Sequence, residues 1–238
     1  ERYVIVYNGE IYNKKILAER LNILNDSNIF KSDTRLLLEA ISQKGLFWSL
    51  DNIVGMFSFS LWDKKEKSLY LCVDRYSEKP LYYSFRNNSL FFASELNIFE
   101  NINWINNLKV DKNSRDLYFL LGYIPAPLTI WKGINKLIPG RVLKFVENTN
   151  KPIEINYSIS KKNLYEKDFL KSHIKEGNLK NFVSEILENT IERYLISDVE
   201  SGVLLSGGTD SSLITAIASK LSKNRIKTFS IGFPSKRY

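Results

Sequence analysis

Short apolar runs separated by polar turns dominate the first part of the chain. The runs are rich in β-branched and aromatic residues, which is typical of β-strands. They cover Tyr3–Tyr7, Gly55–Trp62, Ser68–Val73, Leu81–Phe85 and Leu90–Ala93. Two segments between them, Lys14–Asn22 and Thr34–Gln43, instead repeat leucine, isoleucine and alanine at helical spacing. This mixture predicts an α+β domain of layered antiparallel sheets with helices packed alongside.

Local residue choices mark where these elements begin and end. Asn8-Gly9 follows the first apolar run and predicts a turn there. Ser32-Asp33 precedes the second helical segment and predicts its start, with Asp33 as a possible N-cap. Further along, we expect a helix over Val110–Gly122 and a strand over Arg141–Val146.

The last part of the chain changes pattern. Residues Lys151–Gly177 are polar, rich in lysine and poorly periodic, so they predict a linker. After this linker the periodicity predicts a helix, a strand, a second helix and a second strand, over Leu179–Ile196, Val203–Leu205, Ser211–Leu221 and Thr228–Ile231. The last three form one βαβ unit, which is the seed of a parallel sheet whose ligands bind at the carboxyl ends of the strands.

The turn inside this βαβ unit is the strongest candidate for chemistry. Ser206–Ser212 places Gly207 and Gly208 between the strand and the helix. Glycines let backbone N–H groups crowd one point, and the start of a helix adds positive dipole charge. The segment therefore predicts a cradle for phosphate or pyrophosphate, although it lacks the lysine of a Walker loop. The purely structural alternative is a tight turn in which Asp210 or Ser211 caps the helix.

Composition narrows the class of protein. The chain has 238 residues and a formal charge of +8, but no arginine-rich block or zinc-ligand spacing, so we expect no nucleic-acid partner. No apolar stretch is long enough for a membrane span, and we expect no membrane partner. The single cysteine, Cys72, excludes an internal disulfide and indicates a reducing compartment, so we expect a cytoplasmic location.

The glycine-rich loop resembles the S-G-G-x-D-S-S loop of N-type ATP pyrophosphatases. Its lead-in, residues 197–202, is similar to the S-D-V-P-x-G of asparagine synthetases, with Glu200 where proline is usual. The resemblance implies ATP as cofactor, with Mg²⁺ held at Asp210. The implied nucleotide and pyrophosphate contacts are Leu204, Ser206, Gly207, Gly208, Asp210, Ser211, Ser212, Ile231 and Gly232.

The first part of the chain carries a second resemblance. Residues 8–13 match the N-G-E-I-Y-N of class II glutamine amidotransferases, which use an N-terminal nucleophile. Further matches follow in the family's order: K-S-D-T at 31–34, G-M-F-S-F at 55–59, D-R-Y-S-E-K-P-L-Y-Y at 74–83 and F-A-S-E at 92–95. Ser77 replaces the usual glycine, and Arg35 the usual glutamate.

This resemblance assigns roles to four residues. The Asn8 side-chain amide and the Gly9 backbone N–H would form an oxyanion hole for glutamine hydrolysis. Glu10 and Asp33 would bind the α-ammonium group of glutamine. The structural alternatives are a turn at Asn8-Gly9 and a helix cap at Asp33.

The catalytic nucleophile of this family is an N-terminal cysteine, and it has no counterpart here. Residue 1 is glutamate, and Cys72 lies in an apolar strand as a small buried residue. We therefore expect the chain to start inside the glutaminase domain, to lack the rest of the aspartate site after Tyr238, and not to hydrolyse glutamine by itself. His173 in the linker is expected to be exposed and without a catalytic role.

The two resemblances together imply a glutamine-dependent asparagine synthetase. The expected domains are a glutamine amidotransferase domain at 1–148, a linker at 149–177, and the start of an α/β parallel-sheet ATP pyrophosphatase domain at 178–238. The substrates would be glutamine, aspartate and ATP, and a homodimer is possible by analogy. The alternatives are a related amidotransferase that aminates another carboxylate, and an inactive protein that only binds nucleotide.

Overall fold

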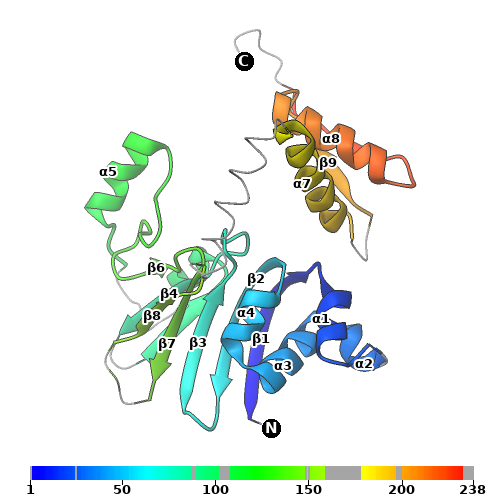
Figure 1. Cartoon of the computed structure of the whole chain (residues 1–238). Helices are drawn as coiled ribbons and strands as arrows, with labels where there is room; N and C mark the ends of the chain where they lie inside the picture. Colours follow the sequence, from blue (N-terminus) through cyan, green and yellow to red (C-terminus); the bar gives the residue numbers. More distant parts are fainter. Residues whose placement is uncertain are drawn as a thin grey trace. The chain divides into compact units, whose positions relative to one another are not determined.

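The computed structural model describes residues 2–24, 26–86, 89–101, 108–147, 149, 151–158, 178–196 and 200–232. The chain divides into two compact units, Glu1–Ser160 and Lys161–Tyr238. Each unit has its own sheet or sheets and its own buried apolar cluster, so the two are described separately (Figure 1).

The first unit is built on a five-stranded antiparallel sheet in the order β1-β2-β3-β7-β8. A second antiparallel sheet has the order β5-β4-β6. The strands are β1 (Tyr3–Ile11), β2 (Gly55–Asp63), β3 (Ser68–Val73), β4 (Tyr82–Arg86), β5 (Ser89–Ala93), β6 (Asn135–Lys136), β7 (Arg141–Val146) and β8 (Ile153–Asn156). The described helices are α1 (Lys14–Arg20), α2 (Ser27–Phe30), α3 (Asp33–Lys44), α4 (Leu46–Asn52), the 3₁₀ helix η1 (Leu96–Asn101) and α5 (Lys112–Leu121).

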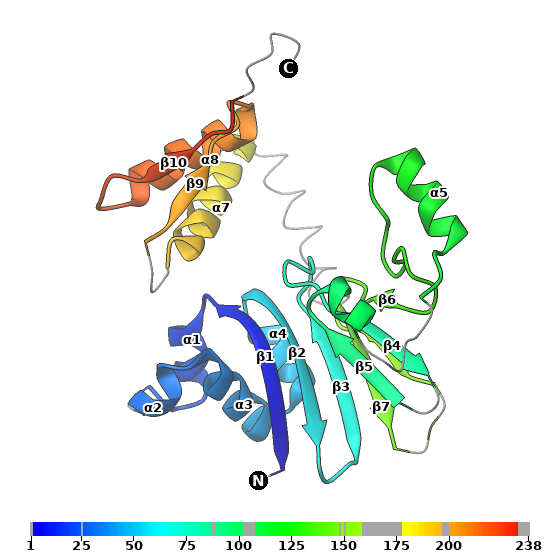
Figure 2. The same ribbon diagram turned by 180° about the vertical axis from the view of Figure 1, so that it is seen from behind.

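The two faces of the larger sheet are covered differently. Helices α1, α3 and α4 cover one face, where their leucines and isoleucines pack against side chains such as Phe57 and Phe59 of β2 (Figure 2). The smaller sheet covers the opposite face over β3 and β7, around Leu71 and Leu143. Helices, sheet and sheet thus form the layered α+β arrangement expected from the sequence, which is confirmed.

Strand β1 forms an edge of the larger sheet, and the even-numbered side chains of its first half are exposed. Val4 and Val6 are 48% and 65% exposed. The strand continues through Asn8-Gly9 to Ile11, so the predicted turn at Asn8-Gly9 was wrong. Nine successive residues pair with β2, and this pairing outweighs the local turn preference of Asn-Gly.

The described part of the predicted linker includes a strand of the larger sheet. Ile153–Asn156 pair with β7 as strand β8, and Tyr157 donates a hydrogen bond from its hydroxyl to the Val73 carbonyl at 2.6 Å. Residues 159–177, including His173, lie outside the described part of the chain. The boundaries of the linker therefore stay a prediction.

The described residues of the second unit, 178–196 and 200–232, form a βαβ motif and a helix that precedes it. Strands β9 (Gly202–Leu204) and β10 (Lys227–Phe229) are parallel, and α8 (Thr209–Leu221) connects them. Helix α7 (Leu179–Tyr194) packs on α8 around Ile191, Ile217 and Ala218. The expected βαβ motif is confirmed.

Candidate functional site

The backbone of β1 directs alternate N–H groups to opposite sides of the strand. The Phe57 N–H and carbonyl both bond to Asp74, at 3.1 and 2.9 Å, so they face away from β1. Gly9, which lies opposite Phe57, is therefore at a non-hydrogen-bonded position of the β1–β2 pair. Its N–H points to the open edge of the sheet, where it has no partner among the described residues. An N–H group in this position is available to a ligand.

Gly9 is also required for space. A Cβ at this position would lie 2.3 Å from the Met56 carbonyl oxygen and 2.6 Å from the Phe57 Cα. Gly55, on the partner strand, has the same restriction, because its Cβ would lie 2.0 Å from the Glu10 carbonyl oxygen. The two glycines let β1 and β2 approach closely at the end of β1 that carries the candidate residues.

Asn8 is held from the smaller sheet. Its side-chain Nδ2 donates to the Ser94 Oγ at 3.5 Å, across 86 residues of sequence. Ser94 directly follows β5 and belongs to the F-A-S-E motif, for which the sequence suggested no role. Asn8 directly precedes Gly9, so a side-chain amide and an open backbone N–H belong to neighbouring residues at this end of β1. An oxyanion hole needs two donors of this kind.

Asp33 is engaged on both of its carboxylate oxygens. Oδ2 accepts the Ile11 N–H at 2.8 Å, and Oδ1 lies 2.6 Å from the Lys14 Nζ. The helix cap is Ser32, whose hydroxyl accepts the Arg35 N–H at 3.4 Å, so the alternative of Asp33 as N-cap was wrong. Asp33 lies instead in the first turn of α3 and ties that helix to the end of β1. Lys14 was not found by sequence reasoning, because nothing in its local pattern indicates a partner 19 residues later.

Glu10 and Tyr7 complete this end of β1. Glu10 is partly buried, and its carboxylate has no hydrogen bond or ion pair among the described residues. The Tyr7 hydroxyl is buried and has no hydrogen-bond partner in the described part of the chain. Burial, and to a lesser degree the negative charges of Asp33 and Glu10, raise the pKa of Tyr7 well above its ordinary value. The structure thus brings all four predicted residues to one end of β1.

The second candidate region is the loop between β9 and α8. Gly207 has a φ of +83°, which favours glycine, and Gly208 is the N-cap of α8 with no side-chain cap. The helix begins at Thr209, so neither Asp210 nor Ser211 is its cap, and that alternative was wrong. The first intrahelical bond runs from the Ser212 N–H to the Gly208 carbonyl at 3.0 Å. The N–H groups of the three preceding residues, Thr209, Asp210 and Ser211, have no acceptor among the described residues.

Side chains around this loop hold it in shape and leave the N–H groups open. The Ser206 and Ser211 hydroxyls lie 2.9 Å apart, and the Ser230 hydroxyl donates to the Leu205 carbonyl at 2.6 Å. Leu204 and Ile231, the predicted neighbours of the nucleotide base, are 78% and 85% exposed. Gly232, the last described residue, is exposed as well.

Asp210 is exposed in the first turn of α8. Among the described residues no group of three or more histidine, cysteine or acidic side chains could hold a metal ion. A Mg²⁺ ion at Asp210 would therefore take most of its oxygen ligands from phosphates and water, as hard cations in nucleotide sites do.

Two buried groups outside these regions have structural roles. Cys72 is fully buried in β3, and burial raises the pKa of its thiol well above the ordinary value, so it is not a nucleophile. Asp74 accepts backbone N–H groups from Phe57, Tyr76, Glu78 and Lys79 and thereby fixes the loop that follows β3.

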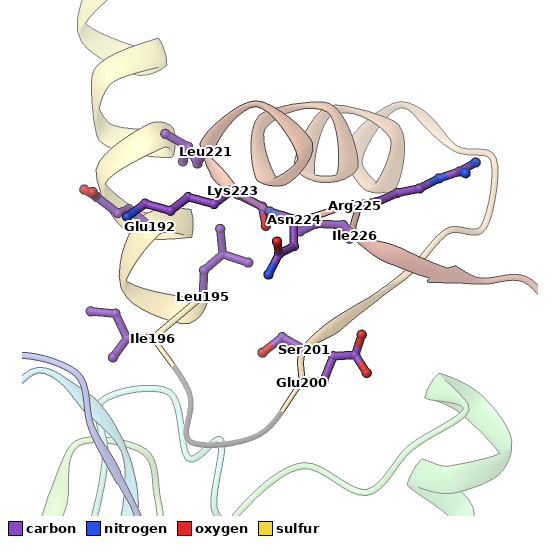
Figure 3. Close-up of a pocket in the computed structure, with 11 residues that line it drawn as sticks. Glu192, Leu195, Ile196, Glu200, Ser201, Leu221, Lys223, Asn224, Arg225 and Ile226 are labelled. Atoms are coloured by element: carbon purple, nitrogen blue, oxygen red, sulfur yellow. Dashed lines mark hydrogen bonds between the residues drawn. The ribbon is translucent and has the colours of Figure 1, made fainter.

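A hollow of about 370 Å³ lies in the second unit, away from the glycine-rich loop (Figure 3). Leu195, Leu221 and Ile226 line it together with Glu192 and Lys223. It opens where α7 and α8 end and where β9 and β10 begin, whereas the loop follows the end of β9. The hollow is therefore separate from the candidate nucleotide region.

Comparison with protein families also divides the chain into a first and a second part. The family model described as glutamine amidotransferase domain matches residues 1–157, so the chain belongs to that family. The model described as asparagine synthase matches residues 183–238. The two matches in this order confirm the predicted resemblance to glutamine-hydrolysing asparagine synthetases.

Individual relatives extend along nearly the whole chain. The glutamine-hydrolyzing asparagine synthetases 1 and 3 of Bacillus subtilis are 32% and 30% identical to it, each over 98% of this chain. A protein of Methanocaldococcus jannaschii is 33% identical over 98% of this chain. The chain spans only 44%, 35% and 37% of the lengths of the M. jannaschii protein and of B. subtilis synthetases 1 and 3, respectively.

Among solved structures, a glutamine phosphoribosylpyrophosphate amidotransferase from B. subtilis is similar over 96% of this chain and 45% of its own. Its TM-score is 0.43 and its sequence identity 16%. A glutamine aminotransferase class-II domain protein from Silicibacter pomeroyi is similar over 65% of this chain and 67% of its own, with a TM-score of 0.35 and 14% identity.

Proposed function

We propose that the chain forms the glutamine-binding part and the pyrophosphate-binding part of a glutamine-dependent asparagine synthetase. The observation that carries the proposal is the open N–H of Gly9, in the residue that follows the Asn8 amide at the end of β1. Two donors of this kind stabilise the negative charge that develops on an amide oxygen during hydrolysis. The relatives' names and the two family matches support the reaction class.

In this proposal glutamine binds with its side-chain amide at Asn8 and Gly9. Its α-ammonium group is bound by the carboxylates of Glu10 and Asp33. Hydrolysis releases ammonia, which attacks an adenylated aspartate to give asparagine, AMP and pyrophosphate. Cys72 has no part in this chemistry because it is buried.

The loop Ser206–Ser212 binds the pyrophosphate portion of ATP in this proposal. The unclaimed N–H groups at the start of α8 would donate to phosphate oxygens, and Leu204, Ile231 and Gly232 would flank the nucleotide. Asp210 would hold Mg²⁺, which neutralises phosphate charge when it is bound.

The binding half of the proposal is tested on the 238-residue chain by calorimetric titration with L-glutamine and, separately, with pyrophosphate. Glu10→Gln should weaken glutamine binding by about tenfold, because a charge-assisted contact is lost. Glu19→Gln, on the exposed side of α1, is the matched control and should leave it unchanged. Equal affinity of the wild type and Glu10→Gln would exclude Glu10 from the site.

The acceptor is tested by ATP–pyrophosphate exchange with the complete protein. Exchange that depends on aspartate supports asparagine synthesis. Exchange with a different carboxylate would make the protein a related amidotransferase, and nucleotide binding without any exchange would make it a binding protein only.

A further inference from the structure

Helix α1 begins with a positive charge where a helix normally favours a negative one. Lys14 is its first residue, and the first turn contains no acidic side chain. The Lys14 ammonium lies 2.6 Å from Asp33 Oδ1. The two side chains are only 24% and 14% exposed, so the ion pair is largely shielded from water. The ion pair with Asp33 thus compensates for placing the positive charge of Lys14 at the start of α1, where the helix dipole disfavours it.

This ion pair engages the carboxylate of Asp33, which is the group that would bind the α-ammonium of an amino-acid substrate. The other carboxylate oxygen already accepts the Ile11 N–H. In the described structure an arriving α-ammonium group therefore finds both carboxylate oxygens of Asp33 already bound to a donor, one of them to the Lys14 ammonium. Glu10, in contrast, has a carboxylate without a partner among the described residues.

We propose that Lys14 is an internal counter-ion of the amino-acid site and a determinant of its affinity. Its ammonium occupies the place on Asp33 that the α-ammonium of glutamine takes, so binding exchanges one ammonium for another. This inference rests on the proposed function, in which Glu10 and Asp33 bind glutamine. Lys14 reduces the binding free energy that the substrate's ammonium group contributes, because the ion pair between Lys14 and Asp33 must break before that group can bind.

The test compares Lys14→Met with Lys15→Met in the 238-residue chain. Both substitutions remove one positive charge from the first turn of α1, but Lys15 is exposed and has no ion pair with Asp33. Each variant is titrated calorimetrically with L-glutamine and with glutaramate, which is glutamine without its α-amino group.

Lys14→Met should bind L-glutamine about fivefold more tightly than the wild type, which corresponds to the loss of a competing ion pair of ordinary strength. Its affinity for glutaramate should not rise, because that ligand brings no ammonium group to Asp33. Lys15→Met should match the wild type with both ligands.

Several outcomes would overturn the inference while leaving the proposed function intact. They are equal or weaker glutamine binding by Lys14→Met, and a parallel gain for glutamine and glutaramate. Glutamine binding by none of the three proteins would instead refute the glutamine site itself, and the proposed function with it.

Folding of the variants is checked through the Ile11 amide, whose exchange with solvent reports whether Asp33 still holds the end of β1. If Lys14→Met does not fold, Lys14→Gln replaces it in the same titrations. Failure of both to fold would make the ion pair a purely structural contact and would overturn the inference.

Discussion

Helices α3 and α8 start next to the two candidate regions, and they start in opposite ways. At α3 the Ser32 hydroxyl accepts a backbone N–H of the first turn, and Asp33 is bound by Lys14 and the Ile11 N–H. At α8 the N-cap is Gly208, no side chain caps the helix, and Asp210 is exposed. Both starts combine small polar residues with an aspartate, yet one is closed by the protein and the other is open.

The difference shows what each helix start can do. A helix whose first N–H groups already have an acceptor is held in place, as α3 is against β1. A helix that starts with glycine keeps those donors for an anion from solution. The capped start of α3 holds the candidate glutamine region in place, whereas the uncapped start of α8 is itself the proposed binding group.

The largest effect is expected from the two glycines of these regions. Gly9→Ala should destabilise the first unit by about 3 kcal/mol, because its Cβ would press against the backbone of Met56 and Phe57. Gly207→Ala should cost the second unit only about 1 to 2 kcal/mol, since φ is positive but the space around it is open.

The two units can be followed independently in these variants. All four tryptophans lie in the first unit, so tryptophan fluorescence during urea unfolding reports that unit alone. Amide exchange in α8 reports the second unit. A smaller loss for Gly9→Ala than for Gly207→Ala would contradict the close approach of β1 and β2.

The next largest difference in stability is expected between substitutions of the two aspartates, Asp33 and Asp210. Asp33→Asn should destabilise the first unit by about 2 kcal/mol, because it removes the ion pair with Lys14 and weakens the bond from the Ile11 N–H. Asp210→Asn should change the stability of the second unit by about 0.5 kcal/mol or less, as expected for an exposed residue. Urea unfolding and amide exchange measure the two changes, and equal effects would remove the distinction between the two helix starts.

A cap can be removed from α3 and added to α8. Ser32→Ala should cost about 1 kcal/mol. Gly208→Ser should stabilise α8 by a few tenths of a kcal/mol, since its backbone is extended and the nearest atom to a new Cβ lies at 3.6 Å. The new hydroxyl should also compete for the N–H groups and weaken pyrophosphate binding severalfold in calorimetry. Unchanged pyrophosphate binding, despite a more stable α8, would argue against the cradle.

The smallest effect is a pH dependence at a third helix. Asp111 caps α5, and hydrogen bonds from the Ser114 N–H and hydroxyl lower the pKa of its carboxyl below the ordinary 3.8. A lowered pKa means that the cap stabilises α5 above pH 3.8 and that this stabilisation is lost as the pH falls through the lower, folded-state value. The protection of the Ser114 amide, taken as its exchange rate relative to the intrinsic rate at the same pH, should fall on acidification in the wild type. In Asp111→Asn this acid-dependent loss of protection should be missing. If the loss persists in the variant, a group other than Asp111 causes it.

Sequence patterns predicted the elements of this fold well where periodicity was strong. Strands β1, β2, β3 and β7 of the larger sheet, helix α3 and the βαβ motif were found because their apolar residues recur at clear intervals. Asn8-Gly9 was misread because its turn preference is local, whereas nine paired residues of β1 and β2 decide the conformation. Strand β8 was missed because only four residues pair, in a polar segment.

The candidate sites were predictable in their residue types but not in their contacts. Motifs indicated Asn8, Gly9, Glu10 and Asp33, whereas Ser94 and Lys14 became visible only through distances across 86 and 19 residues. The structural alternative for the loop, with Asp210 or Ser211 as the cap of α8, was offered because both are good capping residues. The backbone of Gly207 and Gly208 instead starts the helix earlier than those side chains suggest.

The N–H groups of β1 alternate in direction along the strand, so the site depends on the number of residues in β1. Even-numbered residues of the strand bond to β2, while Gly9 and Ile11 present their N–H groups to the open edge. Deleting or inserting one residue between Ile5 and Asn8, with pairing kept on the far side, would turn the Gly9 N–H into the sheet. Replacing the exposed Val4 or Val6 is therefore expected to disturb this edge less than changing the number of residues in the strand.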